Sequence, residues 1–484
     1  MPAPAAKKPS LPEGLVAVVK RDCPTCCLVE PVLRQLREVS GRLTVYTQDD
    51  PSFPAGLRAV DDRELEMSWH HAIETVPTLL RVEGGVEVGR TVGWNRKDWE
   101  ALTGISGLGP SLPAHRPGCG SLSVDPDRAD ALMARFSGGK IRSRRIELAS
   151  LEDEMDSLFD RGWTDGLPVV PPTEARVLRM LEATRRAPDE IVATVPPDLA
   201  PASVEKVAIN AVMAGCKPEY LPVVLAALEA ACTDEFNMHG VLATTMPVGP
   251  VIVVNGPIRR AIGMNWGVNV LGQGNRANLT IGRALQLVIR NVGGGRPGEV
   301  DRAAHGNPGK LSFCFAEDEE GSPWEPLSVE RGVSAGVSAV TLFSGEGTRC
   351  VIDQKSRTAD SLASTFAANL RGLHHPKLVF AFDAMLVVGP EHARVFRDAG
   401  WSKARLRAEI DARLQIPWAD LARGAHGIAE GMPEQFRSET LPKFRPGGLL
   451  LVHAGGTAGM FSEIVGGWQS GPTGSQPTTK EVRP

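Results

Sequence analysis

The stretch KRDCPTCCLV, residues 20–29, places three of the chain's eight cysteines within five positions. Two of them, Cys23 and Cys26, have the spacing Cys-x-x-Cys, and Cys27 follows directly. The β-branched run GLVAVVK precedes them at residues 14–20 and predicts a buried strand. From Cys26 onward, apolar residues recur at the spacing of a helix. The cysteine pair is therefore expected where a strand ends and a helix begins.

This position favours a working thiol pair over a metal site. We expect Asp22 to cap the helix and Cys23 to lie near its N-terminus, where the helix dipole stabilises a thiolate and lowers its pKa. A zinc site requires a second pair of ligands, and the next cysteine is as distant as Cys119. We therefore predict a redox-active disulfide between Cys23 and Cys26, with no metal and no other cofactor.

The segments that follow extend the pattern. LTVYTQDD predicts a second strand, and ETVPTLLRVEGGVEVGRTVGW (residues 74–94) predicts a Val-Pro turn, a hairpin and the start of a closing helix. With the Cys-Pro-Thr-Cys motif, residues 12–105 resemble the thioredoxin-fold family. The resemblance implies that Cys23 is the attacking thiol and Cys26 the resolving thiol. It also implies that Pro77 is a cis proline beside them, in the substrate groove.

The sequence departs from that family in details that bear on the redox potential. Pro24 and Thr25 separate the cysteines where the family has Gly-Pro, and the preceding strand lacks the family's buried carboxylate. Cys27 is an additional cysteine, which we expect to be a small apolar residue on the buried face of the helix.

The composition predicts disorder at both ends of the chain and a linker between the two parts. Residues 1–11 and 470–484 are expected to be disordered. Residues 106–149 are rich in glycine, proline and serine and predict a linker. Cys119 lies in this linker between two glycines, where it is either a second relay thiol or a bystander.

The rest of the chain predicts a larger α/β body of two lobes, residues 150–330 and 331–469. Apolar runs at residues 248–257, 384–389 and 447–455 each stop at a glycine, as strands of an α/β sheet do. The ends of such strands converge where ligands bind. The predicted fold class is thus α/β throughout, a thioredoxin-like domain followed by this body.

A loop rich in amides predicts a ligand site in the body. GMNWGVNVLGQGNRAN, residues 263–278, contains four asparagines among glycines. Buried amides without partners would each cost roughly 1–3 kcal/mol, so we expect a polar ligand to satisfy them. The candidate substrate-binding residues of the body are Asn265, Asn275, Arg276, Arg296 and His305.

Cys216 and Cys314 are the candidate catalytic thiols of the body. Cys216 follows an apolar helix and is either a turn residue or a thiol directed into the cleft. Cys314 alternates with Phe313 and Phe315, as in a strand. It faces the cleft if those phenylalanines face the core, and it is an inert buried thiol otherwise.

The body also shows a second resemblance, carried by GWTDGLPVVPPT, MAGCKPEYLPVVLAAL, VNGPIRRAIGMNWG and SFCFAEDEEGSPWEPL. These stretches resemble an uncharacterised bacterial family that is associated with a Sec/Cys-Gly-Ser-Cys motif. This resemblance implies no particular reaction.

Composition narrows the classes of function. The net charge of −4 gives no electrostatic footprint for nucleic acid or an anionic membrane. No apolar run reaches the roughly 18 residues of a membrane span, and the N-terminus lacks the apolar core of a secretory signal. We therefore expect a cytoplasmic protein that binds neither nucleic acid nor membrane.

The function that we predict is a thiol-dependent enzyme. The thioredoxin-like domain, residues 12–105 and here called the head, would supply thiol–disulfide exchange to the body through Cys23 and Cys26. The body would act on a small polar substrate by reduction, sulfur transfer or cleavage of a carbon–heteroatom bond. Its partners would be that substrate and a thiol reductant or redox partner protein. Two alternatives remain open: a protein-disulfide reductase fused to a binding module, and a protein that handles soft metals or organometals with cysteine and histidine.

Overall fold

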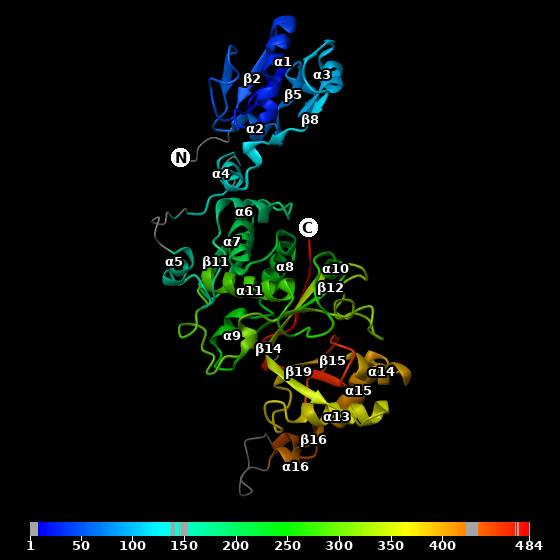
Figure 1. The fold of residues 1–484 in the computed structure, drawn as a ribbon. Coiled ribbons are helices and arrows are strands. Elements are labelled where there is room, and N and C mark those ends of the chain that lie inside the picture. Colours follow the sequence, from blue (N-terminus) through cyan, green and yellow to red (C-terminus); the bar gives the residue numbers. More distant parts are fainter. Residues whose placement is uncertain are drawn as a thin grey trace. The chain divides into compact units, whose positions relative to one another are not determined.

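The computed structural model describes residues 8–136, 141–144, 146, 153–422, 434–469, 471 and 474–483. The chain divides into two compact units. The first is Met1–Arg142 with Glu174–Leu178, and the second is Ser143–Thr173 with Arg179–Pro484. Helices and strands are mixed in each of them (Figure 1), so the predicted α/β class is confirmed.

The elements of the first unit are β1 (Gly14–Val19), α1 (Pro24–Ser40), β2 (Leu43–Thr47), β3 (Ala59–Asp61), α2 (Glu66–His70), β4 (Thr75–Val76), β5 (Thr78–Glu83), β6 (Val86–Val92), β7 (Trp94–Asn95), α3 (Arg96–Thr103), β8 (His115–Arg116), β9 (Cys119–Gly120), η1 (Leu122–Val124) and α4 (Pro126–Phe136).

A five-stranded sheet, in the order β3-β2-β1-β5-β6, organises this unit. β1 is parallel to β2 and antiparallel to β5, and β5 and β6 form the predicted hairpin. The apolar positions of α1, including Val29 and Leu33, are fully buried against this sheet. The helix ends at Gly41, whose φ of 64° is the left-handed conformation that glycine adopts without strain. The strand–cysteine–helix junction is therefore built as predicted.

The predicted linker is wrong for residues 106–136, which fold onto the first unit. β8 pairs with β7, β9 pairs with β4, and α4 packs on α2 around Leu65 and Leu132. Gly118 allows a close approach of the strands here, because a Cβ atom on it would lie 2.7 Å from the Val76 oxygen. Residues 137–140, 145 and 147–149 of that segment lie outside the described residues.

The N-terminal segment also differs from the prediction of disorder at residues 8–11. The ring of His71 lies 2.9 Å from the backbone oxygen of Pro9, and Leu11 is buried in the core. Residues 1–7 lie outside the described part of the chain.

The remaining elements, which lie in the second unit except for the first turns of α6, are α5 (Glu154–Asp160), α6 (Glu174–Leu181), β10 (Ile191–Val195), β11 (Ala200–Ser203), α7 (Val204–Ala214), η2 (Pro218–Tyr220), α8 (Leu221–Ala231), α9 (Met238–Ala243), β12 (Gly249–Asn255), α10 (Ile258–Ala261), α11 (Arg276–Asn291), η3 (Pro308–Lys310), β13 (Cys314–Ala316), α12 (Leu327–Glu330), β14 (Ala339–Ile352), α13 (Ala359–Arg371), β15 (Phe382–Val388), α14 (Pro390–Asp398), α15 (Lys403–Arg413), β16 (Gln415–Pro417), α16 (Trp418–Leu421), η5 (Glu434–Phe436), β17 (Thr440–Pro442), β18 (Leu449–His453), β19 (Phe461–Gln469) and β20 (Thr478–Glu481).

One sheet spans this unit, so the division into lobes at residues 330 and 331 is wrong. The strands of this sheet follow the order β13-β12-β14-β19-β15-β18, and β20 pairs with β14, whereas β10–β11 and β16–β17 form separate two-stranded sheets. β12 and β13, which were assigned to the first lobe, are thus in the same sheet as β14 and β19. A single apolar cluster contains Phe315 of the edge strand β13 and Leu450 of the opposite edge strand β18, so the sheet curls around it.

Helices cover the outside of the curled sheet. α13, α14 and α15 contribute to a second apolar cluster with β15, β18 and β19. α7, α8 and α11 pack on one another, and α8 and α11 also contact the sheet at β14 and β13. The apolar character of α7 and α8 on most faces, evident in the sequence, follows from this packing.

The C-terminal tail was predicted to be disordered, and this is wrong for Thr478–Glu481. These residues form β20, which pairs antiparallel with Ala339–Leu342 of β14. Polar side chains such as Thr479 gave no apolar signal, but Thr341 binds the Thr479 hydroxyl at 2.9 Å. Residues 470, 472, 473 and 484 lie outside the described residues.

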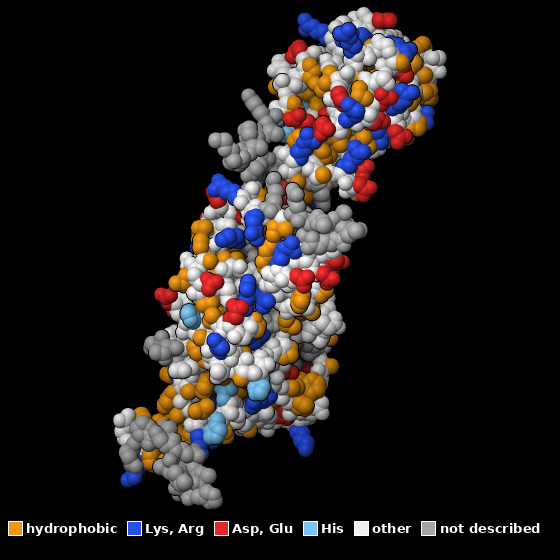
Figure 2. All heavy atoms as spheres, turned by 90° about the vertical axis from the view of Figure 1, so that its left-hand side faces the viewer, with side chains coloured by type: hydrophobic (Ala, Val, Ile, Leu, Met, Phe, Trp, Pro, Cys, Tyr) orange, Lys and Arg blue, Asp and Glu red, His pale blue; other side chains and the backbone are white. Residues whose placement is uncertain are grey.

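None of the helices in the described part of the chain combines the length and the apolar character that crossing a membrane requires. On the face drawn in Figure 2, lysine and arginine side chains are interspersed with aspartate and glutamate in both units. This distribution agrees with the small net charge.

Candidate functional site

The first turn of α1 is built around the Cys23 sulfur. Cys23, and not Asp22 as predicted, is the N-cap residue, and its extended backbone (φ −148°, ψ 111°) turns the side chain over the helix N-terminus. There the sulfur accepts a hydrogen bond from the backbone N–H of Cys26 at 3.3 Å. Pro24 occupies the first turn, where its missing N–H costs nothing. A negative charge on Cys23 is therefore stabilised by both the N–H group and the helix dipole.

The two thiols of the pair have opposite acidities. The hydrogen bond from the Cys26 thiol is the main cause that lowers the pKa of Cys23, and bonds from the Cys119 thiol and the Thr25 N–H lower it further. These effects outweigh burial, and the Cys23 pKa falls to about 5. Burial, followed by the bond to Cys23, raises the pKa of Cys26 far above its usual value. At neutral pH the pair therefore consists of a thiolate at Cys23 and a thiol at Cys26.

The predicted cis peptide bond between Val76 and Pro77 is confirmed, and it lies beside the pair. The Cys23 sulfur is 3.5 Å from the backbone oxygen of Val76. Both cysteines are almost fully buried, since Cys23 is 1% exposed and Cys26 is 0% exposed. The thiolate is thus chemically activated but covered in this conformation.

Cys119 covers the pair from the segment that was predicted to be a linker. Its backbone pairs with Val76 in the β4–β9 ladder, and its side chain is a hydrogen-bond partner of Cys23. The glycines on both sides of Cys119 were a weak signal for this position. A third thiol therefore belongs to the site.

Cys27 does not have the buried position that was expected. It is exposed, and its thiol bonds the backbone oxygen of Arg21 at 3.3 Å. Partial burial and the charge of Cys23 raise its pKa, so it lacks the activation of its neighbour.

The predicted catalytic thiols of the body are buried and lack activation. The Cys216 thiol bonds the backbone oxygen of Thr280 at 3.3 Å, and burial raises its pKa to about 12. Burial likewise raises the pKa of Cys314, which lies in β13 between the half-buried Phe313 and the fully buried Phe315. The phenylalanines face the core, because Phe315 lies in the apolar cluster inside the sheet and Phe313 packs against it. Cys314 is nevertheless an inert buried thiol, since the opposite face of the strand is covered at Gly282 of α11, and the prediction that it would then face the cleft is wrong.

The side-chain amides of the asparagine-rich loop bond backbone groups of the same loop, so the expected need for a ligand is absent in residues 263–278, all of which the structure describes. The side-chain oxygen of Asn278 accepts a hydrogen bond from the backbone N–H of Asn265 at 3.0 Å, and the side-chain NH₂ of Asn278 donates to the backbone oxygen of Asn265 at 2.9 Å. The side-chain oxygen of Asn275 caps α11 by accepting the backbone N–H of Asn278, and its NH₂ group donates to the backbone oxygen of Gly263 at 2.8 Å. Local amide–backbone bonds of this kind are a common use of asparagine in turns.

The other predicted binding residues of the body have structural or peripheral positions. The Arg276 guanidinium donates to the backbone oxygen of Gly215 at 2.8 Å and joins α11 to the end of α7. His305 is exposed, whereas the Nε atom of Arg296 is buried and has no hydrogen-bond partner among the described residues. Pro77, the predicted binding residue of the head, forms the cis bond beside Cys23.

A buried polar cluster lies where the two edges of the body's sheet meet. The Asp318 N–H, just beyond β13, donates to the His453 oxygen at the end of β18 at 2.8 Å. The fully buried Glu317 carboxylate accepts from the Asn255 amide and the Leu327 N–H, both at 2.7 Å. Runs of apolar residues that stop at a polar position, as in VIVVN and LLLVH, were the available sequence signal for this convergence.

Two acceptor atoms of this cluster have no partner within the described residues. His453 Nδ1 faces the Asp318 backbone oxygen at 3.1 Å and must carry the proton, because a carbonyl only accepts. Burial lowers the His453 pKa, so the ring is neutral and Nε2 has a free lone pair. The Oδ1 atom of Asn255 is likewise buried and unpaired.

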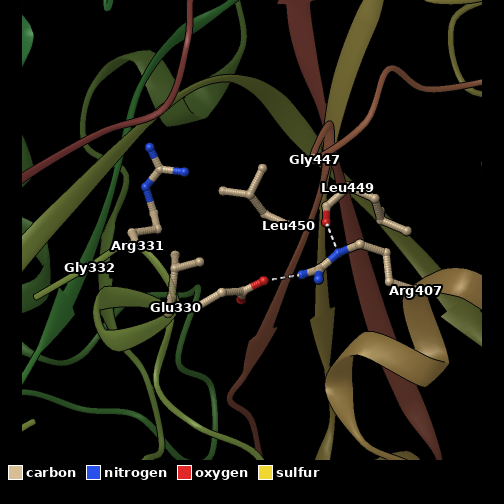
Figure 3. Close-up of a pocket in the computed structure, with 8 residues that line it drawn as sticks. Glu330, Arg331, Gly332, Arg407, Gly447, Leu449 and Leu450 are labelled. Carbon is tan, nitrogen blue, oxygen red and sulfur yellow. Dashed lines mark hydrogen bonds and ion pairs between the residues drawn. The ribbon is translucent and has the colours of Figure 1, made fainter.

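A cavity of about 460 Å³ opens beside α12, α15 and β18 (Figure 3). Glu330, Arg331 and Arg407 line it, with Leu327, Gly332, Gly447, Leu449 and Leu450. Burial raises the Glu330 pKa, but ion pairs with Lys403 and Arg407 outweigh it and the net shift is downward. Arg407 also donates to the Leu449 oxygen at 2.9 Å, so Glu330 and Arg407 are already paired, and the Arg331 guanidinium donates to the Thr479 hydroxyl and the Pro477 oxygen.

Among the residues that we could describe, no group of three histidine, cysteine or acidic side chains is arranged to hold a metal ion. No family model matches the chain, and no curated protein matches it at a significant level. The geometry of the three thiols is therefore the main guide to function.

Proposed function

We propose that the first unit is a thioredoxin-like thiol–disulfide exchange domain in which Cys23 attacks and Cys26 resolves. The observation that carries this proposal is the position of the Cys23 sulfur at the N-terminus of α1, where it accepts the Cys26 N–H at 3.3 Å beside the fully buried Cys26 thiol. The opposite shifts of the two pKa values agree with it. The parallel β1–β2 pair, the antiparallel β5–β6 hairpin and the cis bond before Pro77 further support it.

The exchange proceeds in two displacements. The Cys23 thiolate attacks one sulfur of a substrate disulfide, forms a mixed disulfide and expels the other sulfur as a thiolate. The Cys26 thiol then loses its proton to the departing group and attacks the Cys23 sulfur, which expels the second substrate thiolate. The products are a Cys23–Cys26 disulfide and a reduced substrate, and two electrons have passed from the pair to the substrate. A thiol reductant restores the pair.

This proposal is tested by disulfide reduction with a dithiol as the electron source. The Cys23→Ser variant is expected to lose at least 100-fold in rate, because no other thiol of the site has a lowered pKa. Cys350→Ser is the matched control, since Cys350 is an exposed thiol of the second unit. Retention of the full rate in Cys23→Ser would overturn the proposal.

As a second candidate, we propose that the polar cluster of the body binds a small ligand with N–H or O–H groups. The unpaired acceptors His453 Nε2 and Asn255 Oδ1 favour this, since buried acceptors without donors are costly. A panel of small amines, amides and polyols can be screened by thermal shift. Hits should be lost in His453→Phe and kept in the control His375→Phe, which changes an exposed histidine. Hits that survive His453→Phe would argue against the cluster.

A further inference from the structure

The segment that carries Cys119 lies against the thiol pair as an added strand. Cys119 and Gly120 pair antiparallel with Val76 and Thr75, the residues directly before the cis proline. The ladder continues beyond β9, because the N–H of Ser121 donates to the Glu74 oxygen at 2.9 Å. Cys119 stands at the end of this short ladder beside the cis proline, and its partner Val76 presents the backbone oxygen that lies 3.5 Å from the Cys23 sulfur. The Cys119 thiol is also a hydrogen-bond partner of Cys23.

Side chains from around the pair hold this strand in place. The Thr25 hydroxyl, between the two cysteines, donates to the Pro117 oxygen at 2.6 Å. The Lys20 ammonium, at the end of β1, donates to the Gly120 oxygen at 2.9 Å. The strand is thus tied on both sides of Cys119 by residues that flank Cys23 in the sequence.

Glycine makes the close approach possible. A Cβ atom on Gly118 would lie 2.5 Å from the Thr75 side chain and 2.7 Å from the Val76 oxygen. A Cβ atom on Gly93, on the facing segment, would lie 2.8 Å from the Gly118 nitrogen. The two glycines therefore allow backbone to lie on backbone beside the thiols, at distances that a larger residue at either position would not permit.

We propose that β9 is a tethered internal partner of the exchange site, and that Cys119 forms a disulfide with Cys23 in competition with Cys26. This inference rests on the proposed exchange activity of Cys23. An external disulfide requires access to the Cys23 sulfur, and residue Cys23 as a whole is 1% exposed with β9 in place. Exchange with an outside partner therefore requires β9 to leave, and the Cys23–Cys119 disulfide is a closed, resting form of the site.

The closed form is reached by the same chemistry. After Cys23 has formed a mixed disulfide with a small oxidant such as glutathione disulfide, the Cys119 thiol gives up its proton and attacks the Cys23 sulfur. Glutathione leaves as the thiolate and takes the proton, and a Cys23–Cys119 disulfide remains. Attack by Cys26 on Cys23 then releases Cys119 as a thiol, so the site isomerises without further oxidant or reductant.

The experiment removes Cys26 and asks which partner Cys23 chooses. Reduced Cys26→Ser protein and the Cys26→Ser, Cys119→Ser double variant are treated with glutathione disulfide at low protein concentration, and disulfides are mapped on peptides of the monomer. Both carry Cys27→Ser, because Cys27 shares a peptide with Cys23. Melting temperatures establish that both are folded.

The first variant is expected to contain the Cys23–Cys119 disulfide as its main product at Cys23, and the double variant to carry glutathione on Cys23 instead. Glutathione on Cys23 of the first variant, with Cys119 still a free thiol, would overturn this inference and leave the proposed exchange activity standing. Cys23 left unmodified in both variants would overturn both.

Discussion

The hydroxyl of Thr25 donates a hydrogen bond of 2.6 Å to the backbone oxygen of Pro117, 92 positions further along the chain. This bond joins the residue between the two cysteines to the strand that brings the third. It is one of the contacts that hold the Cys119 strand over the thiolate, together with the β4–β9 ladder and the bond from Lys20 to Gly120.

Replacing Thr25 by valine is expected to open the site more often. The change keeps the shape of the side chain, removes the hydroxyl and leaves the Pro117 oxygen without its donor. A bond of this kind is worth about 1 kcal/mol, so the open population should rise about fivefold. Cys23 should then be alkylated by iodoacetamide about five times faster.

Thr103→Val is the control for this change, because the Thr103 hydroxyl donates to the Trp99 oxygen at 2.7 Å on the distant helix α3. Equal rates of Cys23 alkylation in both variants would show that the Thr25 bond does not hold the strand.

The rate of Cys23 alkylation should depend on pH with a midpoint near 5. The folded-state pKa of about 5 means that Cys23 is a thiolate above this pH and a protonated, unreactive thiol below it. The rate should be nearly constant from pH 7 to pH 9 and fall as the pH drops through 5. Mass spectrometry of the Cys23 peptide measures this.

Cys350 supplies the internal comparison, because burial and Glu463 raise its pKa. Its alkylation should still be increasing at pH 9. If the Cys23 rate also climbs steeply between pH 7 and pH 9, the thiolate assignment is wrong.

Substitution of Gly118 by alanine should displace β9. The added methyl group would meet the Thr75 side chain at 2.5 Å and the Val76 oxygen at 2.7 Å, and neither the strand nor its partner can move without breaking the β4–β9 ladder. We expect a loss of about 1–3 kcal/mol in the free energy of unfolding, the usual cost of overpacking, and faster alkylation of Cys23.

The matched control is Gly120→Ala in the same strand, since a Cβ atom on Gly120 meets nothing within 4 Å. Unfolding in denaturant and the alkylation rate should both stay close to wild type there. A Gly118→Ala protein that matches Gly120→Ala in both measurements would contradict the tight packing of this strand.

The parts of this site that follow from local sequence could be predicted, and those that depend on distant pairing could not. The run Gly14–Val19 and the helical spacing after Cys26 are local signals, and they placed the thiol pair correctly. The pairing of Val76 with Cys119 joins segments that no periodicity relates, and its glycines are equally typical of a linker. The composition of this segment therefore indicated a connection where the chain forms part of the site.

In the body, too, local elements could be predicted from the sequence, and the pairing of distant strands could not. Helices such as α7 and α8 were evident from their apolar runs, whereas the sheet order places β12 beside β14 across about eighty residues of sequence. The asparagine-rich loop was misjudged for a different reason. The prediction counted the cost of burying unpaired amides, but the amides are paired with backbone groups of the same loop.

Glu317 should be essential to the stability of the body. Its carboxylate is fully buried, and it satisfies the Asn255 amide and the Leu327 N–H where the edges of the sheet meet. Glu317→Ala would leave both donors without this acceptor and open a cavity, with an expected loss of about 3–5 kcal/mol in the free energy of unfolding.

Glu325→Ala is the control, because it truncates an exposed glutamate beyond the same strand, and it should change the free energy of unfolding by less than about 0.5 kcal/mol. Denaturant unfolding followed by tryptophan fluorescence measures the difference, and similar midpoints for the two variants would show that Glu317 does not hold the sheet edges together.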